Sequence, residues 1–373
     1  MREADRGRPT VDVGSPGSAM SSVSVVIPCY NYGHFLPEAV SSVLNQAGVD
    51  VRVLIIDDAS QDDSAQVAQQ IAESDPRVEV VVHQVNQGHL KTYNEGLLDW
   101  ADGDYTVLLS ADDQLTPGAL RRAANLLDAN PGVGFVYGHP IHFNYDSAPP
   151  PARTTVRGWS IWPGQWWIER QFRYTHSCIT SPEVVVRTSL QKHVGGYDLR
   201  LPHTGDVEMW MRLASHADVG YIRGADQAFY RMHKHNMTKA RTKVVDLTQR
   251  RAAYDVFLER CSDQLPNAAE LADIVHRGLA RDALWTAARA YDRRRTERIP
   301  VDELEAFAFD CWPQASKMQV YRALKLRKRI GARMMPYLQP FILWAVVRKL
   351  QDVWWWRSWK LRGLLSHPAT REN

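Results

Sequence analysis

Four short apolar runs near the start of the chain restrict its fold more than any other feature. They read SVSVVIPC, VRVLIIDD, VEVVVHQ and YTVLLSADD, and they begin at residues 22, 51, 78 and 105. Short runs rich in β-branched residues and bounded by turn residues are typical of buried strands. The segments between them show helical spacing, as in 34–46, 61–74 and 90–101. Strands that alternate with helices build βαβ units, so the sequence predicts an α/β fold with a mostly parallel central sheet flanked by helices.

Polar residues follow three of the predicted strands, at the point where each strand ends. Parallel strands end at the same edge of a sheet, and ligands of open α/β sheets bind at that edge. We therefore expect these residues to lie close together. They are Pro28 and Tyr30 after the first strand, Asp57 and Asp58 after the second, and Asp112 and Asp113 after the fourth.

The adjacent acids Asp112 and Asp113 place two like charges where an apolar strand ends. Mg²⁺ and Mn²⁺ prefer oxygen ligands, and proteins commonly hold them with one or two carboxylates plus substrate phosphates. The pair therefore suits a divalent cation that binds a diphosphate and stabilises a departing phosphate. The alternative is that both acids are solvated loop residues before a helix capped by Thr116, with Pro117 in its first turn.

Four segments, in their order and spacing, resemble the family 2 glycosyltransferases, which have the GT-A fold and invert the anomeric centre. The segments are 23–46, 53–64, 86–113 and 204–214. The resemblance covers residues 22–238 and implies a GT-A-like domain, with a nucleotide-binding half at 22–142 and an acceptor half at 143–238. Helical patterns over 239–335 predict a C-terminal helical extension. The polar residues 1–21 are expected to be disordered.

The resemblance also implies which residues bind the donor. Pro28 and Tyr30 match the loop that packs on the nucleotide base, and Asp58 matches the carboxylate that hydrogen-bonds the uracil ring. Asp112 matches the residue that reaches the ribose or the metal. Asp113 matches the direct ligand of the metal, Mn²⁺ or Mg²⁺, on the donor diphosphate. The implied donor is a nucleotide-diphosphate sugar, with a UDP-sugar as the preferred candidate.

Asp206, in the segment TGDVEMW, matches the catalytic base of the family. Such a base deprotonates the acceptor hydroxyl as that hydroxyl attacks the anomeric carbon. The usual family motif has two acids, Glu-Asp, whereas Gly205 precedes Asp206 here, and Glu208 competes for the same role. The alternative is that Asp206 caps the helix that follows it.

Several basic residues are further candidates. His233, in YRMHKHNMT, matches a histidine that approaches the metal or diphosphate in relatives, although a structural histidine is equally compatible with the pattern. Arg231 is a rival as a diphosphate contact, and His235 is close in sequence. His176 is a candidate on the acceptor side, with a hydrogen-bonded core histidine as the alternative. Lys91 could neutralise phosphate charge or lie on a helix surface.

Tryptophans gather at Trp159, Trp162, Trp166 and Trp167. Their rings could stack on sugars of the acceptor by apolar contact. The alternative is that they pack in the core beneath the acceptor loop.

Charge and cysteine content bear on partners and compartment. The chain has 45 basic and 42 acidic residues, for a net charge of +3, so nucleic acid is not an expected partner. Its 4 cysteines are far apart and have no metal-ligand spacing, which indicates a reducing compartment. Residues 1–20 do not have the apolar stretch of a secretory signal, so we expect a cytoplasmic location.

The C-terminal segment 336–373 is basic and aromatic. From Lys317 onward there are 13 Lys and Arg against 2 acids. The uncharged run PYLQPFILWAVV is shorter than the roughly 20 residues that span a bilayer. Amphipathic helices with Trp on one side and Arg and Lys on the other lie in the membrane interface, which would place the protein at the inner face of the cell membrane. The alternative is a helical appendage that packs on the protein or forms a dimer.

Taken together, these patterns predict an inverting, metal-dependent glycosyltransferase that uses a nucleotide-diphosphate sugar. The acceptor would be a saccharide or a lipid-linked saccharide. One rival is a sugar-phosphate nucleotidyltransferase, but such an enzyme would carry a Gly- and Arg-rich phosphate loop where this chain has PCYNYGHF. The other rival is a scaffold that binds nucleotide sugar without turnover.

Overall fold

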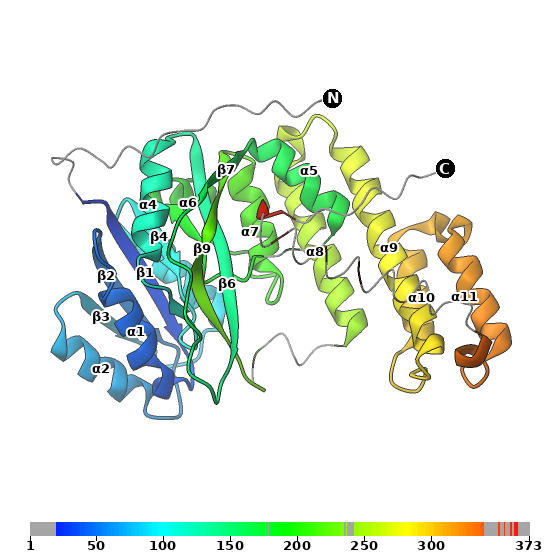
Figure 1. Cartoon of the computed structure of the whole chain (residues 1–373), viewed down its shortest axis with the longest axis horizontal. Coiled ribbons are helices and arrows are strands. Elements are labelled where there is room, and N and C mark those ends of the chain that lie inside the picture. The colour runs from blue at the N-terminus through cyan, green and yellow to red at the C-terminus, as the bar shows by residue number, and fades with distance from the viewer. Residues whose placement is uncertain are drawn as a thin grey trace.

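The structure is a computed structural model that describes residues 20–175, 177, 179–234, 236, 242–338, 350, 354, 359 and 362–364. Its centre is a nine-stranded sheet in the order β3-β2-β1-β4-β8-β6-β9-β5, with β7 paired to β9 (Figure 1). The strands are β1 (Ser22–Cys29), β2 (Asp50–Asp57), β3 (Val78–Val82), β4 (Tyr105–Leu108), β5 (Gln114–Leu115), β6 (Val133–Asn144), β7 (Gly158–Trp162), β8 (Val185–Arg187) and β9 (Asp218–Met232). The predicted α/β class is confirmed.

The two halves of the sheet differ in strand direction. β1 pairs in parallel with β2 and β4, and β2 pairs in parallel with β3, so the parallel arrangement expected from the βαβ pattern holds here. β8 then runs antiparallel to both β4 and β6, although β6 and β9 are parallel. β5 and β7 are antiparallel to β9. The antiparallel pairs arise beyond β4, where the sequence no longer alternates strand with helix.

Helices cover both faces of the sheet because successive residues of a buried strand point to opposite sides. In β1, Val25 and Ile27 belong to one buried cluster and Val26 belongs to the other. The first face is covered by α1 (Leu36–Leu44), α2 (Ser64–Ser74) and α4 (Ala119–Ala129). The second face is covered by α3 (His89–Asn94), the π-helix η2 (Glu95–Trp100), α5 (Gly164–Tyr174), α6 (Thr188–Val194) and α7 (Gly205–Ala214). The short helix η1 (Gly33–Phe35) precedes α1.

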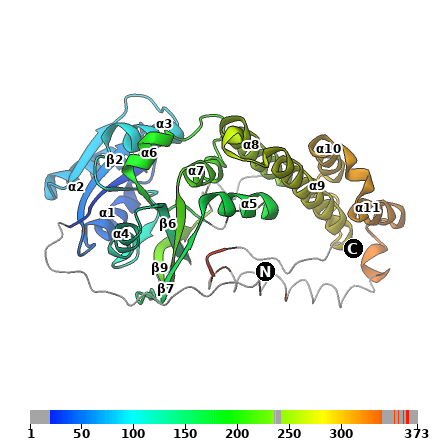
Figure 2. The ribbon, with the colours of Figure 1, turned by 90° about the horizontal axis from the view of Figure 1, so that it is seen from above.

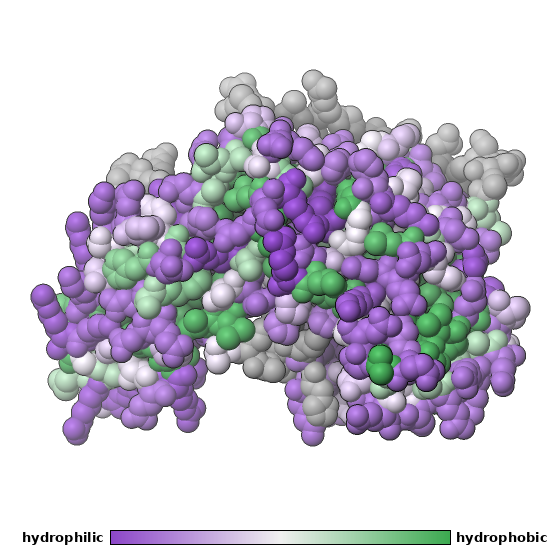
Figure 3. Space-filling view, turned by 180° about the vertical axis from the view of Figure 1, so that it is seen from behind, coloured by the Kyte–Doolittle hydropathy of each residue, from purple (hydrophilic) through white to green (hydrophobic). Residues whose placement is uncertain are grey.

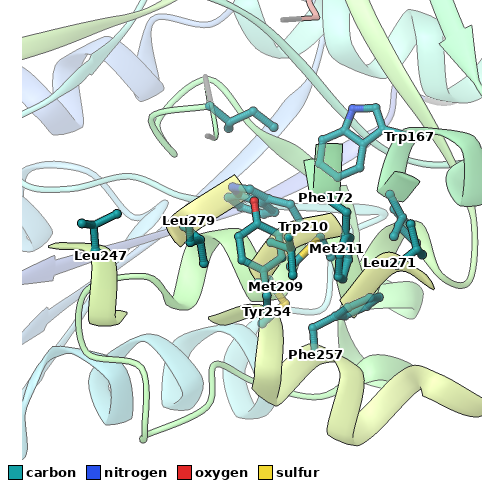
Figure 4. Close-up of a cluster of buried hydrophobic side chains, with 14 of the residues drawn as sticks. Trp167, Phe172, Met209, Trp210, Met211, Leu247, Tyr254, Phe257, Leu271 and Leu279 are labelled. Carbon is teal, nitrogen blue, oxygen red and sulfur yellow. The ribbon is translucent and has the colours of Figure 1, made fainter. Parts of the chain in front are cut away.

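A group of C-terminal helices continues the second face. They are α8 (Lys243–Cys261), η4 (Ser262–Gln264), α9 (Ala268–Asp292), α10 (Val301–Cys311), η5 (Pro313–Lys317), α11 (Gln319–Ile330) and η6 (Met335–Leu338). Seen from above, α8 and α9 lead away from the sheet and α10 and α11 lie at the far end (Figure 2). Apolar side chains of α5, α7, α8 and α9 meet in one core (Figure 4), where the rings of Phe172 and Tyr254 are 5.0 Å apart. The helical extension therefore shares a continuous buried cluster with the sheet.

No helix in the part of the chain that the structure describes is long and apolar enough to cross a membrane. The rear face of the molecule is mostly hydrophilic, and its apolar residues form separate patches (Figure 3).

Two described residues of the C-terminal segment, Trp359 and Gly363, contact β6 of the sheet. The ring of Trp359 is buried with its centroid 5.1 Å from that of His139 in β6. The Tyr137 hydroxyl donates to the Gly363 carbonyl oxygen, and Leu364 is buried. Trp354 is exposed, while Trp344, Trp355 and Trp356 lie outside the described residues. At Trp359, packing on the protein is therefore observed.

Candidate functional site

The loop between β4 and β5 carries Asp112 and Asp113, and the end of β9 closes over it. The Arg231 backbone N–H donates to Asp113 Oδ1 at 2.9 Å, and Arg231 Nε donates to the Asp112 carbonyl oxygen at 3.0 Å. His233 Nε2 lies 2.8 Å from Asp112 Oδ2. Both acids are buried, so they are not solvated loop residues. The following helix begins at Ala119, and Thr116 instead donates its hydroxyl to the Asp226 carbonyl oxygen at 2.5 Å.

Burial and the neighbouring charge of Asp112 raise the pKa of Asp113 well above its usual range, although the Arg231 N–H acts in the opposite direction. Two buried carboxylates this close are stabilised by a cation. Among the described residues, no three His, Cys, Asp or Glu side chains come together as a ready cation site. Mg²⁺ and Mn²⁺ commonly complete their coordination with water and substrate phosphates, so two carboxylates are a sufficient protein contribution. The residues present therefore fit a metal that binds together with a diphosphate.

Arg231 is held by contacts within the protein. Its guanidinium lies between the rings of Phe35 and Phe143, at 4.8 and 4.7 Å from their centroids, and it forms an ion pair with Glu38. His233 is buried against Tyr32 as well, with ring centroids 5.6 Å apart. Both residues therefore order the acidic loop.

Asp58 lies in the loop after β2, where a second loop, 83–88, wraps around it. Asp58 Oδ1 accepts from the Gln87 backbone N–H at 2.7 Å, and Oδ2 accepts from the Gly88 N–H at 2.9 Å. His83 Nδ1 lies 2.8 Å from Oδ1. An ionised carboxylate has about four acceptor positions, so these contacts leave one position on Oδ2. Burial alone would raise the pKa of Asp58, but the hydrogen bonds from Gln87, His83 and Gly88 lower it.

Tyr30 is 44% exposed at the end of β1, beside the half-buried Pro28. The loop that presents Tyr30 is tied to the loop after β2, because the Asn31 N–H donates to Ser60 Oγ at 2.8 Å and the Gln61 N–H donates to Asn31 Oδ1 at 2.7 Å. Asn31 has a left-handed backbone with φ of 58°, a conformation that asparagine adopts more readily than most residues. An exposed aromatic face is thus fixed next to the loop that carries Asp58.

Asp206 lies in the first turn of α7, and the preceding Thr204 is tied to α8 through a hydrogen bond from its hydroxyl to the Gln249 carbonyl oxygen at 2.8 Å. Burial and the Asp206 charge raise the pKa of Tyr197, whose hydroxyl hydrogen-bonds Asp206. Burial also raises the pKa of Tyr93, and the charges of Asp206, Asp112 and Asp113 add to the effect. All three carboxylates therefore lie in the neighbourhood of Tyr93, whose ring is 5.6 Å from that of Tyr197.

The surroundings of Glu208 disfavour it as a competitor for the base. It is 0% exposed, its Oε1 lies 2.7 Å from Arg212 Nε, and Arg260 is 3.9 Å from the same oxygen. A carboxylate buried in this pairing cannot reach an acceptor hydroxyl. The sequence could not show which of Asp206 and Glu208 is buried. Glu208 is buried partly by α8, which carries Arg260 and lies far along the chain.

The remaining candidate residues differ in how far their side chains are exposed. Trp167 is 2% exposed and belongs to the core, whereas Trp166 is 41% exposed and stacks on Trp162 at 6.5 Å. Lys91 is exposed on α3. His176 and His235 lie outside the described residues.

Sequence reasoning missed Glu183, Tyr93, Tyr197, His83 and Glu95. Glu183 is buried, accepts from the Thr180 N–H and hydroxyl at 2.7 Å each, and burial raises its pKa to about 7. His83 had a usable signal, since it follows the third predicted strand at the same sheet edge as the candidate acids. Glu183 and the two tyrosines had none.

Comparisons with known proteins find glycosyltransferases. Residues 24–188 match the family model described as Glycosyl transferase family 2. An uncharacterized glycosyltransferase of Nostoc is 35% identical over 31% of this chain and 35% of its own length. The Campylobacter jejuni GalNAc(5)-diNAcBac-PP-undecaprenol beta-1,3-glucosyltransferase is 34% identical over 32% of this chain and 38% of its own. The chain thus matches less than half the length of these relatives.

Similarity of the fold to a solved structure covers a larger part of the chain than the sequence matches do. S. aureus TarS 1–349 in complex with UDP-GlcNAc superimposes with a TM-score of 0.57 and 18% identity, covering 84% of this chain and 88% of that one. At this identity the likeness concerns the fold alone. It confirms the GT-A-like architecture with C-terminal helices.

Proposed function

This chain belongs to glycosyl transferase family 2, and we propose that it transfers a sugar from a nucleotide-diphosphate donor, preferably a UDP-sugar, to a hydroxyl of a saccharide acceptor with inversion. The observation that carries the proposal is the gathering of three functions at one sheet edge. The Asp58 loop lies beside an exposed tyrosine, and the pair Asp112 and Asp113 follows the neighbouring strand. Asp206, which we assign to the acceptor side, lies in the first turn of α7, and its charge acts on the same buried Tyr93 as the charges of the acidic pair.

Donor binding is assigned to the edge formed by β1, β2 and β4. Tyr30 offers an exposed ring on which a base can stack, and Pro28 supports that loop. Asp58 offers an ionised oxygen with one acceptor position left, which suits the ring N–H of uracil. Asp112 would reach the ribose.

Asp113 would hold a Mn²⁺ or Mg²⁺ ion, with Asp112 beside it and His233 orienting Asp112. When bound, such an ion neutralises the charge of the departing diphosphate. The chain's own contribution is to keep both carboxylates buried and oriented through Arg231 and His233.

Asp206 would act as the general base. It sits at the start of α7, where the helix dipole favours its ionised form, and the Tyr197 hydroxyl orients it. The base removes the proton from the acceptor hydroxyl during attack on the anomeric carbon, opposite the leaving diphosphate. A single displacement needs no covalent nucleophile.

The acceptor is proposed to be a lipid-linked saccharide at the inner face of the cell membrane. The printed name of the Campylobacter relative concerns an undecaprenol-linked acceptor, which supports this class. Residues 322–337 contain no acid and six Lys and Arg, of which Arg327 is buried against Asp292 and Lys328 pairs with Asp302 and Glu305. The same segment exposes Leu326, Met334 and Tyr337 at 54%, 51% and 74%. Cations and apolar side chains on one exposed segment favour an anionic bilayer surface.

The decisive experiment is a calorimetric screen of UDP, GDP and TDP with and without Mn²⁺, followed by assays of the matching nucleotide sugars. We expect metal-dependent binding of one nucleotide and slow hydrolysis of its sugar. Binding without any hydrolysis or transfer would favour the scaffold, and formation of nucleotide sugar from sugar phosphate would favour the nucleotidyltransferase.

A further inference from the structure

His83 occupies a position that the proposed donor site does not explain. It follows β3, and its ring lies between two carboxylates from different elements. Nδ1 is 2.8 Å from Asp58 Oδ1, and Nε2 is 2.9 Å from Glu95 Oε2 in η2. The side chains of His83 and Asp58 are 6% and 5% exposed, so water contributes little to their contact, whereas the Glu95 side chain is 36% exposed.

The chemistry of these contacts fixes the protonation state. Carboxylates can only accept hydrogen bonds, and a neutral imidazole has a single N–H. Both contacts are therefore satisfied together when the ring carries two protons. The charged groups that face the ring are Asp58, after β2, and Glu95, in η2, and both are acidic. Burial lowers the pKa of His83, but the hydrogen bonds and charges of Asp58 and Glu95 outweigh it and raise the pKa above its ordinary value.

Loop 83–88 depends on the same arrangement. The His83 N–H donates to the Asp57 carbonyl oxygen at 2.9 Å, and Asn86 Nδ2 donates to the Asp58 carbonyl oxygen at 3.1 Å. Gly88, which donates to Asp58 Oδ2, has a φ of 87°, a left-handed conformation that glycine adopts without strain. His83 is thus the charged member of a set of donors that orients one carboxylate.

We infer that protonated His83 is a positioning residue, which together with Glu95 holds Asp58 in the orientation that accepts the ring N–H of the donor nucleobase. This inference rests on the proposed function, since it assumes that Asp58 contacts the base. Uracil, thymine and guanine carry a ring N–H, whereas cytosine and adenine carry a ring acceptor instead. An oriented, ionised Asp58 therefore selects the first group.

The inference makes donor affinity depend on pH. When His83 loses its proton, one of its two hydrogen bonds is lost and Asp58 is held less firmly. Because the lost hydrogen bond is charge-assisted, its loss is expected to weaken nucleotide affinity by roughly tenfold.

The experiment measures the UDP dissociation constant by calorimetry with Mg²⁺, from about pH 6 to about pH 8.5. The wild-type constant is expected to rise roughly tenfold across this range, while His83→Gln binds roughly tenfold more weakly at low pH and shows a flatter profile. His139→Gln is the matched control, because His139 is also buried and 2.9 Å from a carboxylate, Asp226, outside the donor site. Its profile should follow that of the wild type. UDP should also exceed CDP in affinity, and His83→Gln should reduce that difference.

Titration of the histidine ring protons by NMR reports the protonation of His83 without nucleotide. A His83 that titrates below its ordinary pKa, or a His83→Gln profile parallel to that of the wild type, would overturn the inference while leaving nucleotide binding intact. If the wild type binds no nucleotide at any pH, the proposed function itself fails.

Discussion

His233 Nε2 lies 2.8 Å from Asp112 Oδ2 and joins residues that are 121 positions apart in the chain. The contact binds the end of β9 to the loop after β4. The contact also orients the Asp112 carboxylate. Carboxylates that ligate a metal, or lie next to one, are commonly held by a hydrogen bond from such a supporting residue.

Replacing His233 with Gln should weaken the metal more than the nucleotide. Loss of such a supporting contact typically lowers metal affinity by about 10–100-fold. Titration of Mn²⁺ at saturating UDP measures this directly, with Lys192→Gln, an exposed change on α6, as the control. Unchanged Mn²⁺ affinity would mean that His233 has only a packing role against Tyr32.

Asp113→Asn and Asp206→Asn should separate binding from transfer. Asp113→Asn should abolish metal-dependent UDP binding, because it removes the charge that holds the ion. Asp206→Asn should bind UDP normally and lose roughly 10²–10⁴-fold in transfer rate, as expected for a general base. Calorimetry and a transfer assay check the two results, with Asp99→Asn on the surface as control. Equal losses of binding in both variants would contradict the assigned roles.

Sequence patterns were sufficient to predict the strands and the residues at their ends, because these depend on short stretches of the chain. The four β-branched runs form β1 to β4, and the polar residues after them meet at one edge. The patterns could not reveal partners supplied from far along the chain. Arg231 reaches Asp113 across 118 residues, and Tyr137 meets Gly363 across 226. Such pairings depend on how β6 and β9 join the sheet, which no periodicity encodes.

Burial was the other property that local patterns could not resolve. Glu208 and Asp206 stand two positions apart on α7, yet Glu208 is enclosed by Arg212 and Arg260 while Asp206 is only partly buried. Likewise, Trp166 and Trp167 are neighbours of opposite exposure. A helix places adjacent residues on different faces, but which face is covered is decided by the helices packed against it.

Glu208→Gln should reduce stability and spare catalysis. Breaking a buried ion pair leaves Arg212 without its partner charge and costs about 3–5 kcal/mol. Thermal melting should show a lower midpoint, while the transfer rate per folded molecule should stay close to the wild-type rate. A folded Glu208→Gln variant that binds UDP but cannot transfer would instead return Glu208 to the list of possible bases.

Asp226→Asn should be destabilising at neutral pH and nearly neutral in acid. Burial alone would raise the pKa of Asp226, but hydrogen bonds from His139 and Arg153 outweigh it and lower the pKa. A lowered folded-state pKa stabilises the protein above the unfolded value of about 3.9, and this stabilisation is lost as the pH falls further. Urea midpoints at several pH values test this: the gap between variant and wild type should be constant from about pH 7 to about pH 5 and shrink below about pH 4. A gap that grows in acid would contradict the sign.

Gly363→Ala should detach the C-terminal residues from the sheet. Gly363 has a φ of 73°, and an added Cβ would lie 2.2 Å from the ring of Tyr221, which is fully buried. Gly331 provides the matched control, because its φ is 83° but nothing lies within 4 Å of an added Cβ. Gly331→Ala therefore measures only the cost of placing alanine in a left-handed backbone conformation, about 1 kcal/mol. Gly363→Ala measures that cost together with the steric clash between the added Cβ and the Tyr221 ring. We expect hydrogen exchange and tryptic cleavage after Arg362 to accelerate in Gly363→Ala and to remain at the wild-type rate in Gly331→Ala. Equal behaviour of the two variants would show that the Tyr221 contact does not anchor this segment.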